Sequence, residues 1–206
     1  MKTTFHDKGA PVYTDQPLLV FHLKPVLDLT DDQLYELCQI NRDLLIELNA
    51  RGELIIMPPT GGETSERNAE ITMQLRLWAK RDGTGTTFDS SGGFRLPNGA
   101  MRSPDAAWLK KSRLEALSPE QRKKFVPLAP DFLVELRSPT DSLSALYDKM
   151  QEYIDNGVQL AWLIDPEVRR IYVYRPQKPV EELRGPETIS GDPLLSGFVL
   201  NLREIW

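Results

Sequence analysis

The chain has 206 residues, of which 40% are hydrophobic and 27% charged, so it can bury a core and is not disordered throughout. Its net charge of -5 argues against a strongly basic, non-specific nucleic-acid binder but leaves room for local basic patches. The single cysteine, Cys38, excludes an internal disulfide framework and lies in an apolar run typical of a buried structural thiol. No run approaches the roughly 18 apolar residues of a membrane helix. These features predict a soluble cytoplasmic protein without a membrane partner.

The first part of the chain predicts an arm, a helix and a hairpin. Residues 1–27 are mixed in composition and contain prolines, which favours an extended N-terminal arm. A helix is expected within residues 29–43, starting at Thr30 or Asp31. Residues 44–59 hold two apolar runs separated by a turn signal, which indicates a β-hairpin.

A longer helix is predicted over residues 65–81. Ile71 and Trp78 fall on one apolar stripe, whereas Met73 and Leu77 fall on another side of the same helix. With apolar side chains in two directions, we expect this helix to be largely buried.

Further along, residues 86–109 predict short strands separated by glycine-rich turns, and residues 112–125 predict a charged, partly helical insertion. A strand is expected at 131–137, followed by a helix at about 140–156, two more apolar runs and an edge strand in the tail. Strands that alternate with helices, without a repeat or a linker, predict one α/β domain over residues 28–206.

The predicted strand at 131–137 carries charge on one side. Successive strand residues point to opposite faces, so Val134 and Leu136 share one face while Glu135 and Arg137 share the other. Two interpretations remain open at this point. The pair is either an ion pair on a half-exposed strand or one wall of a functional site.

The predicted helix at 140–156 has a strong amphipathic pattern and a stop signal at Gly157. Lys149 lies at the edge of its apolar stripe. A lysine in this position either extends to solvent along the packed surface or delivers its ammonium to the margin of the sheet.

Several common kinds of active site have little support. Both histidines, His6 and His22, lie in the predicted arm, and one cysteine cannot form a zinc-finger spacing. No phosphate-binding loop of the GxxxxGK[ST] type occurs. The remaining possibility is an active site whose chemistry depends on carboxylates.

Asp105 stands where one strand is expected to begin, and Glu135 stands in another strand. If these strands are neighbours, the two carboxylates converge, and Mg²⁺ is an ion that one or two carboxylates hold together with water and phosphate oxygens. A nearby lysine would then neutralise the transition state or orient the water. The competing interpretation makes Asp105, which follows Ser-Pro, a turn residue.

The motifs resemble a known family. The pair PD at 104–105 and the triplet ELR at 135–137 resemble the PD-(D/E)XK nuclease superfamily, and the run at 134–176 looks like its Uma-two branch of bacterial restriction endonucleases. GELIIMPPTGGETSERNAEI at 52–71 and the tail LSGFVLNLREIW are similar to the usual beginning and end of that family.

The resemblance implies a restriction-endonuclease-like core, with a central mixed β-sheet flanked by helices, and Mg²⁺-dependent cleavage of phosphodiester bonds. Asp105 and Glu135 match the metal ligands of the motif. Arg137 departs from the motif lysine, and arginine does not exchange its proton near neutral pH. The resemblance to this branch implies that the working lysine is displaced onto the following helix, where Lys149 is the matching position. Many members of the superfamily have a further acidic residue on the first core helix. Glu66 and Glu70 are the two candidates for this position.

Two functions follow as hypotheses. The first is a Mg²⁺-dependent DNA endonuclease, with Mn²⁺ as a possible substitute, in which Arg137 holds the phosphate or Glu135, and in which cutting both strands suggests a possible homodimer. The second is a catalytically inactive nuclease fold that binds nucleic acid or another partner. In a third interpretation the protein is an oligomeric structural protein and the ELR triplet is only an ion pair.

Overall fold

A computed structural model describes residues 19–206, so residues 1–18 of the predicted arm lie outside the described part of the chain. The helices are α1 (Asp31–Ile40), α2 (Gly62–Asp82), α3 (Lys111–Glu115), α4 (Pro119–Arg122) and α5 (Leu143–Asp155). The strands are β1 (Leu19–His22), β2 (Leu45–Leu48), β3 (Glu53–Met57), β4 (Gly85–Asp89), β5 (Phe94–Arg95), β6 (Met101–Arg102), β7 (Ala106–Lys110), β8 (Phe132–Leu136), β9 (Leu160–Asp165), β10 (Arg170–Tyr174), β11 (Glu181–Arg184), β12 (Thr188–Ser190) and β13 (Val199–Asn201).

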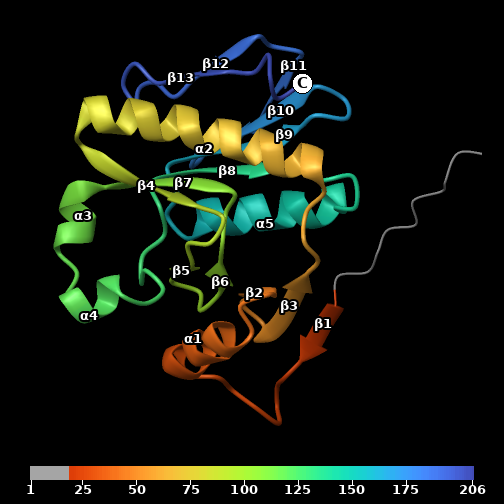
Figure 1. Ribbon diagram of the computed structural model, residues 1–206, viewed down its shortest axis with the longest axis vertical. Coiled ribbons are helices and arrows are strands. Elements are labelled where there is room, and N and C mark those ends of the chain that lie inside the picture. The colour runs from red at the N-terminus through yellow and green to blue at the C-terminus, as the bar shows by residue number, and fades with distance from the viewer. Residues whose placement is uncertain (1–18) are drawn as a thin grey trace, which may run out of the picture.

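A six-stranded mixed sheet forms the centre, in the order β11-β10-β9-β8-β7-β4. The pair β8 and β9 is parallel, and the other neighbouring pairs are antiparallel. Figure 1 shows α5, which connects β8 to β9, on one face of this sheet and α2 on the other. The prediction of an α/β protein with a central mixed sheet flanked by helices is confirmed.

Strand β8 separates two hydrophobic clusters. Phe132, Val134 and Leu136 pack on the side that also holds the apolar residues of α2 and of the C-terminal segment. Leu133 packs on the opposite side, together with Met150 of α5. The alternation predicted from the sequence is therefore confirmed, and Glu135 follows Leu133 onto the side of α5.

A second sheet of five strands, in the order β1-β3-β2-β6-β5, lies beside the central one and packs against α1. The predicted hairpin at 44–59 corresponds to β2 and β3, which pair in antiparallel fashion. The part of the predicted arm at 19–22 is β1, which pairs with β3. This smaller sheet matters for the site because β2 and β6 each supply a charged side chain to it.

The predicted helices are present, with one correction. Helix α1 begins at Asp31 under a Thr30 cap, because the Thr30 side chain accepts a hydrogen bond from the backbone of the third helical residue. The chain turns away after α5 at Gly157, whose φ of 102° suits a residue without a Cβ. The prediction that α2 is largely buried is wrong, because Met73 and Leu77 are 43% and 52% exposed. Only one side of α2 faces the sheet.

Within residues 19–206, none of the helices combines the length and the apolar character that crossing a membrane requires.

Candidate active site

Asp105 lies immediately before β7, and the pairing of Ala106 with Val134 places it beside β8. The backbone N–H of Leu136 donates to Asp105 Oδ2 at 2.7 Å, and Asn68 Nδ2 of α2 donates to Oδ1 at 2.8 Å. Burial raises the pKa of Asp105, although the hydrogen bond from Leu136 and the charge of Lys149 oppose the rise. The carboxylate is therefore fixed in direction by two donors.

Glu135 is contacted by two side chains of α5. Lys149 Nζ lies 2.9 Å from Glu135 Oε1, and the Tyr153 hydroxyl donates to the same oxygen at 2.8 Å. Lys149 and Tyr153 are four residues apart, so they project from the same side of the helix. Burial raises the pKa of Glu135 to about 7; the charges of Asp105 and Glu47 add to the rise, while Lys149 opposes it.

A second carboxylate holds Lys149 from the smaller sheet. Glu47 Oε1 lies 3.0 Å from Lys149 Nζ and accepts a hydrogen bond from the Ser103 backbone at 2.9 Å. Glu47 Oε2 accepts from Arg102 of β6 at 2.9 Å. Burial opposes ionisation of Glu47, but the charges of Lys149 and Arg102 outweigh it and lower its pKa. Lys149 is thus held between carboxylates from both sheets.

The whole cluster carries an excess of acidic groups. Arg102 also contacts Glu152 Oε2 at 2.6 Å, which adds a further carboxylate. When all of its groups are ionised, the cluster has four negative charges and two positive ones. Its members are Glu47, Asp105, Glu135, Glu152, Arg102 and Lys149. This imbalance favours a bound cation.

The donors at the centre fit a hard divalent ion. Asn68 must turn its amide nitrogen toward Asp105, and its Oδ1 is then buried without a hydrogen-bond partner. Tyr153 and Lys149 both contact Oε1 of Glu135, so neither of them occupies the other carboxylate oxygen. Across residues 19–206 no three His, Cys, Asp or Glu side chains gather into a ready-made metal ligand set. A set of two carboxylates suits Mg²⁺, which keeps several waters and binds phosphate oxygens.

A comparison with known protein families finds one whose model matches most of the chain. The family described as "Uma2: Putative restriction endonuclease" matches residues 31–203. The chain belongs to the Uma2 family. The family's description as a putative restriction endonuclease agrees with the resemblance seen in the sequence. No curated protein matches the chain.

A solved structure shows the same fold. The crystal structure of "a putative nuclease belonging to DUF820" from Anabaena variabilis ATCC 29413 is similar over 86% of this chain and 97% of that chain. The TM-score is 0.70 and the sequence identity is 22%, so the similarity concerns the fold. The α/β architecture of this Uma2 chain therefore recurs in an experimentally solved protein.

Of the four predicted site residues, the structure brings Asp105, Glu135 and Lys149 together, while Arg137 points elsewhere. Arg137 NH1 contacts Asp165 Oδ2 at 2.8 Å and makes no hydrogen bond to Glu135. Asp165 is fully buried, so Arg137 provides the countercharge that a buried carboxylate needs. The suggested hold of Arg137 on Glu135 is absent from this structure.

Helix α2 of this Uma2 chain contributes an amide rather than an acid. Glu66 is exposed, and Glu70 accepts a hydrogen bond from Gln74 at 2.8 Å. Asn68, which stands between these two glutamates in the sequence, is the residue of α2 that donates a hydrogen bond to Asp105. A sequence signal for it exists, because Asn68 extends the buried stripe of Ile71 by one helical step toward the N-terminus.

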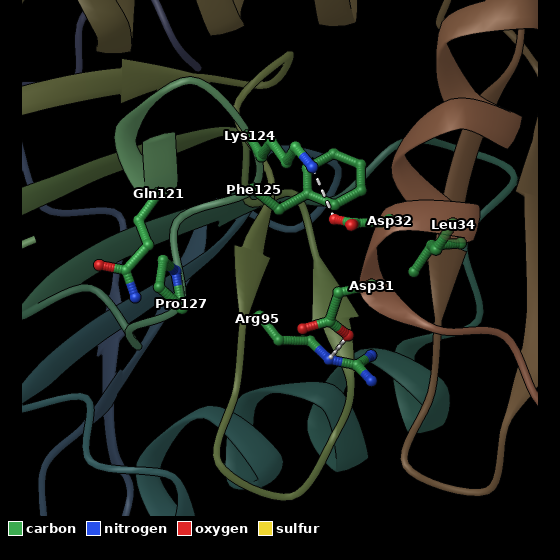
Figure 2. Close-up of a pocket in the computed structure, with 8 residues that line it drawn as sticks. All are labelled: Asp31, Asp32, Leu34, Arg95, Gln121, Lys124, Phe125 and Pro127. Atoms are coloured by element: carbon green, nitrogen blue, oxygen red, sulfur yellow. Dashed lines mark hydrogen bonds and ion pairs between the residues drawn. The ribbon is translucent and has the colours of Figure 1, made fainter. Parts of the chain in front are cut away.

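A separate pocket of about 180 Å³ lies beside α1 and does not include the charged cluster. Figure 2 shows that its two cations are paired: Arg95 Nε contacts Asp31 at 2.9 Å, and Lys124 Nζ contacts Asp32 at 2.6 Å. Phe125 supplies part of its apolar lining. Because neither Asp105 nor Glu135 lines this pocket, it is not part of the candidate active site.

Proposed function

We propose that this Uma2 protein is a Mg²⁺-dependent endonuclease that hydrolyses phosphodiester bonds of DNA. The observation that carries the proposal is the contact of 2.9 Å between Lys149 and Glu135, next to an Asp105 carboxylate oriented by the Leu136 backbone. Three residues that are far apart in the sequence converge with the residue types that phosphodiester hydrolysis needs. The family supports a nuclease, and restriction endonucleases act on DNA.

Asp105 and Glu135 would hold the metal ion, with Mn²⁺ as a possible substitute for Mg²⁺. The chemistry that such an ion supplies is activation of a water molecule and neutralisation of charge on the phosphodiester. In the hydrolysis the water loses a proton and its oxygen bonds to phosphorus, one phosphorus–oxygen ester bond breaks, and the leaving oxygen takes up a proton. Asn68 supports this arrangement because it fixes one oxygen of Asp105.

Lys149 acts as a fixed positive charge. Burial alone would lower its pKa, but the charges of Glu135 and Glu47 outweigh burial and raise the pKa above its ordinary value. A lysine that stays protonated at neutral pH cannot take a proton from water. It can donate a hydrogen bond to a phosphate oxygen and stabilise the negative charge of the transition state.

Glu47 and Arg102 are positioning residues in this proposal. Glu47 holds the Lys149 ammonium together with Glu135, and Arg102 fixes the second oxygen of Glu47. The network restricts the side-chain freedom of Lys149 before substrate binds. Preorganised charge of this kind accounts for much of the rate enhancement that electrostatic stabilisation provides.

A second candidate function is nucleic-acid binding or partner binding by a nuclease fold that does not turn over. The observation that favours it is the position of the motif lysine: Arg137 stands there and is engaged by Asp165. The ammonium of Lys149 is also bound by two carboxylates, so substrate phosphate must compete with Glu47 and Glu135 for it.

DNA cleavage tests the proposal. Plasmid and linear DNA are incubated with Mg²⁺ or Mn²⁺ and with the wild type, Asp105→Ala or Glu135→Ala. We expect both substitutions to reduce cleavage at least about hundredfold, since each removes a metal ligand. Asp148→Asn is the matched control, because Asp148 is an exposed acid on α5 next to Lys149.

Cleavage that both alanine variants retain would show that this cluster is not the active site. A wild type that binds DNA without cutting it under any of these conditions would support the second candidate function instead.

A further inference from the structure

Helix α2 has an outward side that no other part of residues 19–206 covers. On one flank, Arg76 donates to the hydroxyls of Thr86 and Thr87 of β4 at 3.3 Å. On the other flank, Gln74 exchanges hydrogen bonds of 2.9 and 2.8 Å with Asn201 of β13. Between these two contacts the helix faces solvent along its length (Figure 1).

The outward side combines an apolar centre with charged ends. Met73 and Leu77 are 43% and 52% exposed, and Ala69 is exposed one turn before them. Glu66 lies at the N-terminal end of this side and Lys80 at the C-terminal end. Among residues 19–206 neither of these two has a hydrogen-bond or ion-pair partner. We call these five residues the α2 stripe.

The α2 stripe is symmetric about Met73. Its members follow one another at intervals of three, four, four and three residues. At about 100° per residue, Ala69 and Leu77 lie about 40° to either side of Met73, and Glu66 and Lys80 about 20° to either side. The N-terminal half therefore mirrors the C-terminal half in position, while the two ends have opposite charges.

We infer that the α2 stripe binds the α2 stripe of a second copy of this chain, with the two helices antiparallel. A two-fold axis at Met73 brings Met73 against Met73 and Ala69 against Leu77. It also places Glu66 of each copy opposite Lys80 of the other. Charge complementarity thus selects a second copy as the partner, and it selects the antiparallel orientation, because a parallel pair would place like charges together.

The size of the contact predicts a weak dimer. Glu66 and Lys80 are about 21 Å apart along the helix at 1.5 Å per residue. One helix pair of this length buries less than the roughly 800 Å² per partner of a standard interface. Asn68 lies on the inner side of α2, against Asp105, so pairing of the stripes leaves the charged cluster undisturbed.

The oligomeric state of the full chain tests the inference. Sedimentation velocity across a concentration series is expected to show a reversible dimer of the wild type. Met73→Glu places two like charges on the symmetry axis and is expected to raise the dimer dissociation constant at least about tenfold. Val168→Glu is the matched control, since Val168 is 53% exposed at the turn between β9 and β10.

A charge exchange tests the orientation of the helices. Lys80→Glu and Glu66→Lys each replace two attractive pairs by repulsive ones, so each is expected to raise the dissociation constant about fivefold. The double variant restores opposite charges and is expected to return to within about twofold of the wild type. Circular dichroism checks that every variant is folded.

A wild type that stays monomeric at every concentration would overturn the inference. A dimer that Met73→Glu leaves intact would also overturn it, because the interface would then lie elsewhere. So would a double variant whose dissociation constant is as high as that of the single variants.

Discussion

Helices α5 and α2 lie on opposite faces of the same sheet (Figure 1). Each departs from a simple division into an apolar inner side and a polar outer side. Helix α5 turns a charged residue inward: Lys149, whose side chain is 13% exposed, reaches two carboxylates. Helix α2 instead turns apolar residues outward, at Met73 and Leu77.

The two departures have different physical costs and therefore different meanings. Burying an ammonium costs several kcal/mol unless carboxylates surround it, so such a residue indicates a preorganised charged site. Exposing two apolar side chains costs little, because much of any protein surface is apolar. The outward residues of α2 gain significance from the opposite charges of Glu66 and Lys80 at the two ends of the same side, rather than from exposure alone.

The largest expected effect is a difference in the free energy of unfolding between variants of Lys149, which points inward, and Lys80, which points outward. Lys149→Met leaves Glu47 and Glu135 without their shared cation, and we expect the free energy of unfolding to fall by about 3 to 5 kcal/mol. Lys80→Met on α2 is the control and is expected to change it by less than about 0.5 kcal/mol. Urea denaturation measures both. Equal effects would mean that the Lys149 cluster contributes nothing specific to stability.

A smaller contrast exists within α2 itself. Leu75 is fully buried, so Leu75→Ala is expected to cost about 2 to 5 kcal/mol through lost burial and a cavity. Leu77→Ala, half a turn away, is expected to cost less than about 0.5 kcal/mol when the protein is dilute enough to be monomeric. A large loss of monomer stability in Leu77→Ala would show that the outward side packs against the rest of the chain.

The smallest expected effect is a change in how stability depends on pH. The pKa of Glu135 is raised from its ordinary 4.5 to about 7, so between these values the folded state holds a proton that the unfolded state has released. This contribution is fully present below pH 4.5 and is lost as pH rises through about 7. In the presence of EDTA, Glu135→Gln should lack this fall in stability.

The pH dependence can be sharpened with metal. Mg²⁺ binds the ionised carboxylate, so it should stabilise the wild type more at pH 8 than at about pH 6, and should stabilise Glu135→Gln little at either. Identical pH profiles of the wild type and Glu135→Gln without metal would contradict a raised pKa at this position.

Part of the site could be predicted from local patterns. Glu135 stands in the apolar run FLVEL, and Glu47 stands in the closely similar run LIEL, but only Glu135 was predicted to be a site residue. An acid inside a buried strand is a signal in both cases, and it would have indicated Glu47 as well. Asn68 gave a comparable signal as a polar residue on the buried stripe of α2.

Other parts could not be predicted in this way. Arg102 lies in a strand of two residues, β6, which is too short to show a period, and its two carboxylate partners come from β2 and α5. Arg137 shares a face with Glu135 by alternation, but Asp165, at the end of the neighbouring strand β9, is the carboxylate that binds it. Pairing between distant elements has no local signature.

Local sequence patterns predicted most of the helices and strands, including the strand that carries Glu135, because periodicity shows which side of an element is apolar. They also predicted the family, because its motifs are short runs of residues that can be read directly from the chain. Which side chains contact one another became visible in the folded structure alone. Lys149 joins Glu47 of the smaller sheet to Glu135 of the central sheet, and Arg137 turns to Asp165. The fold also leaves the Met73 side of α2 uncovered. The physical reason is that a pattern along the chain records that a residue is suited to burial, whereas its partner depends on which distant segment packs there.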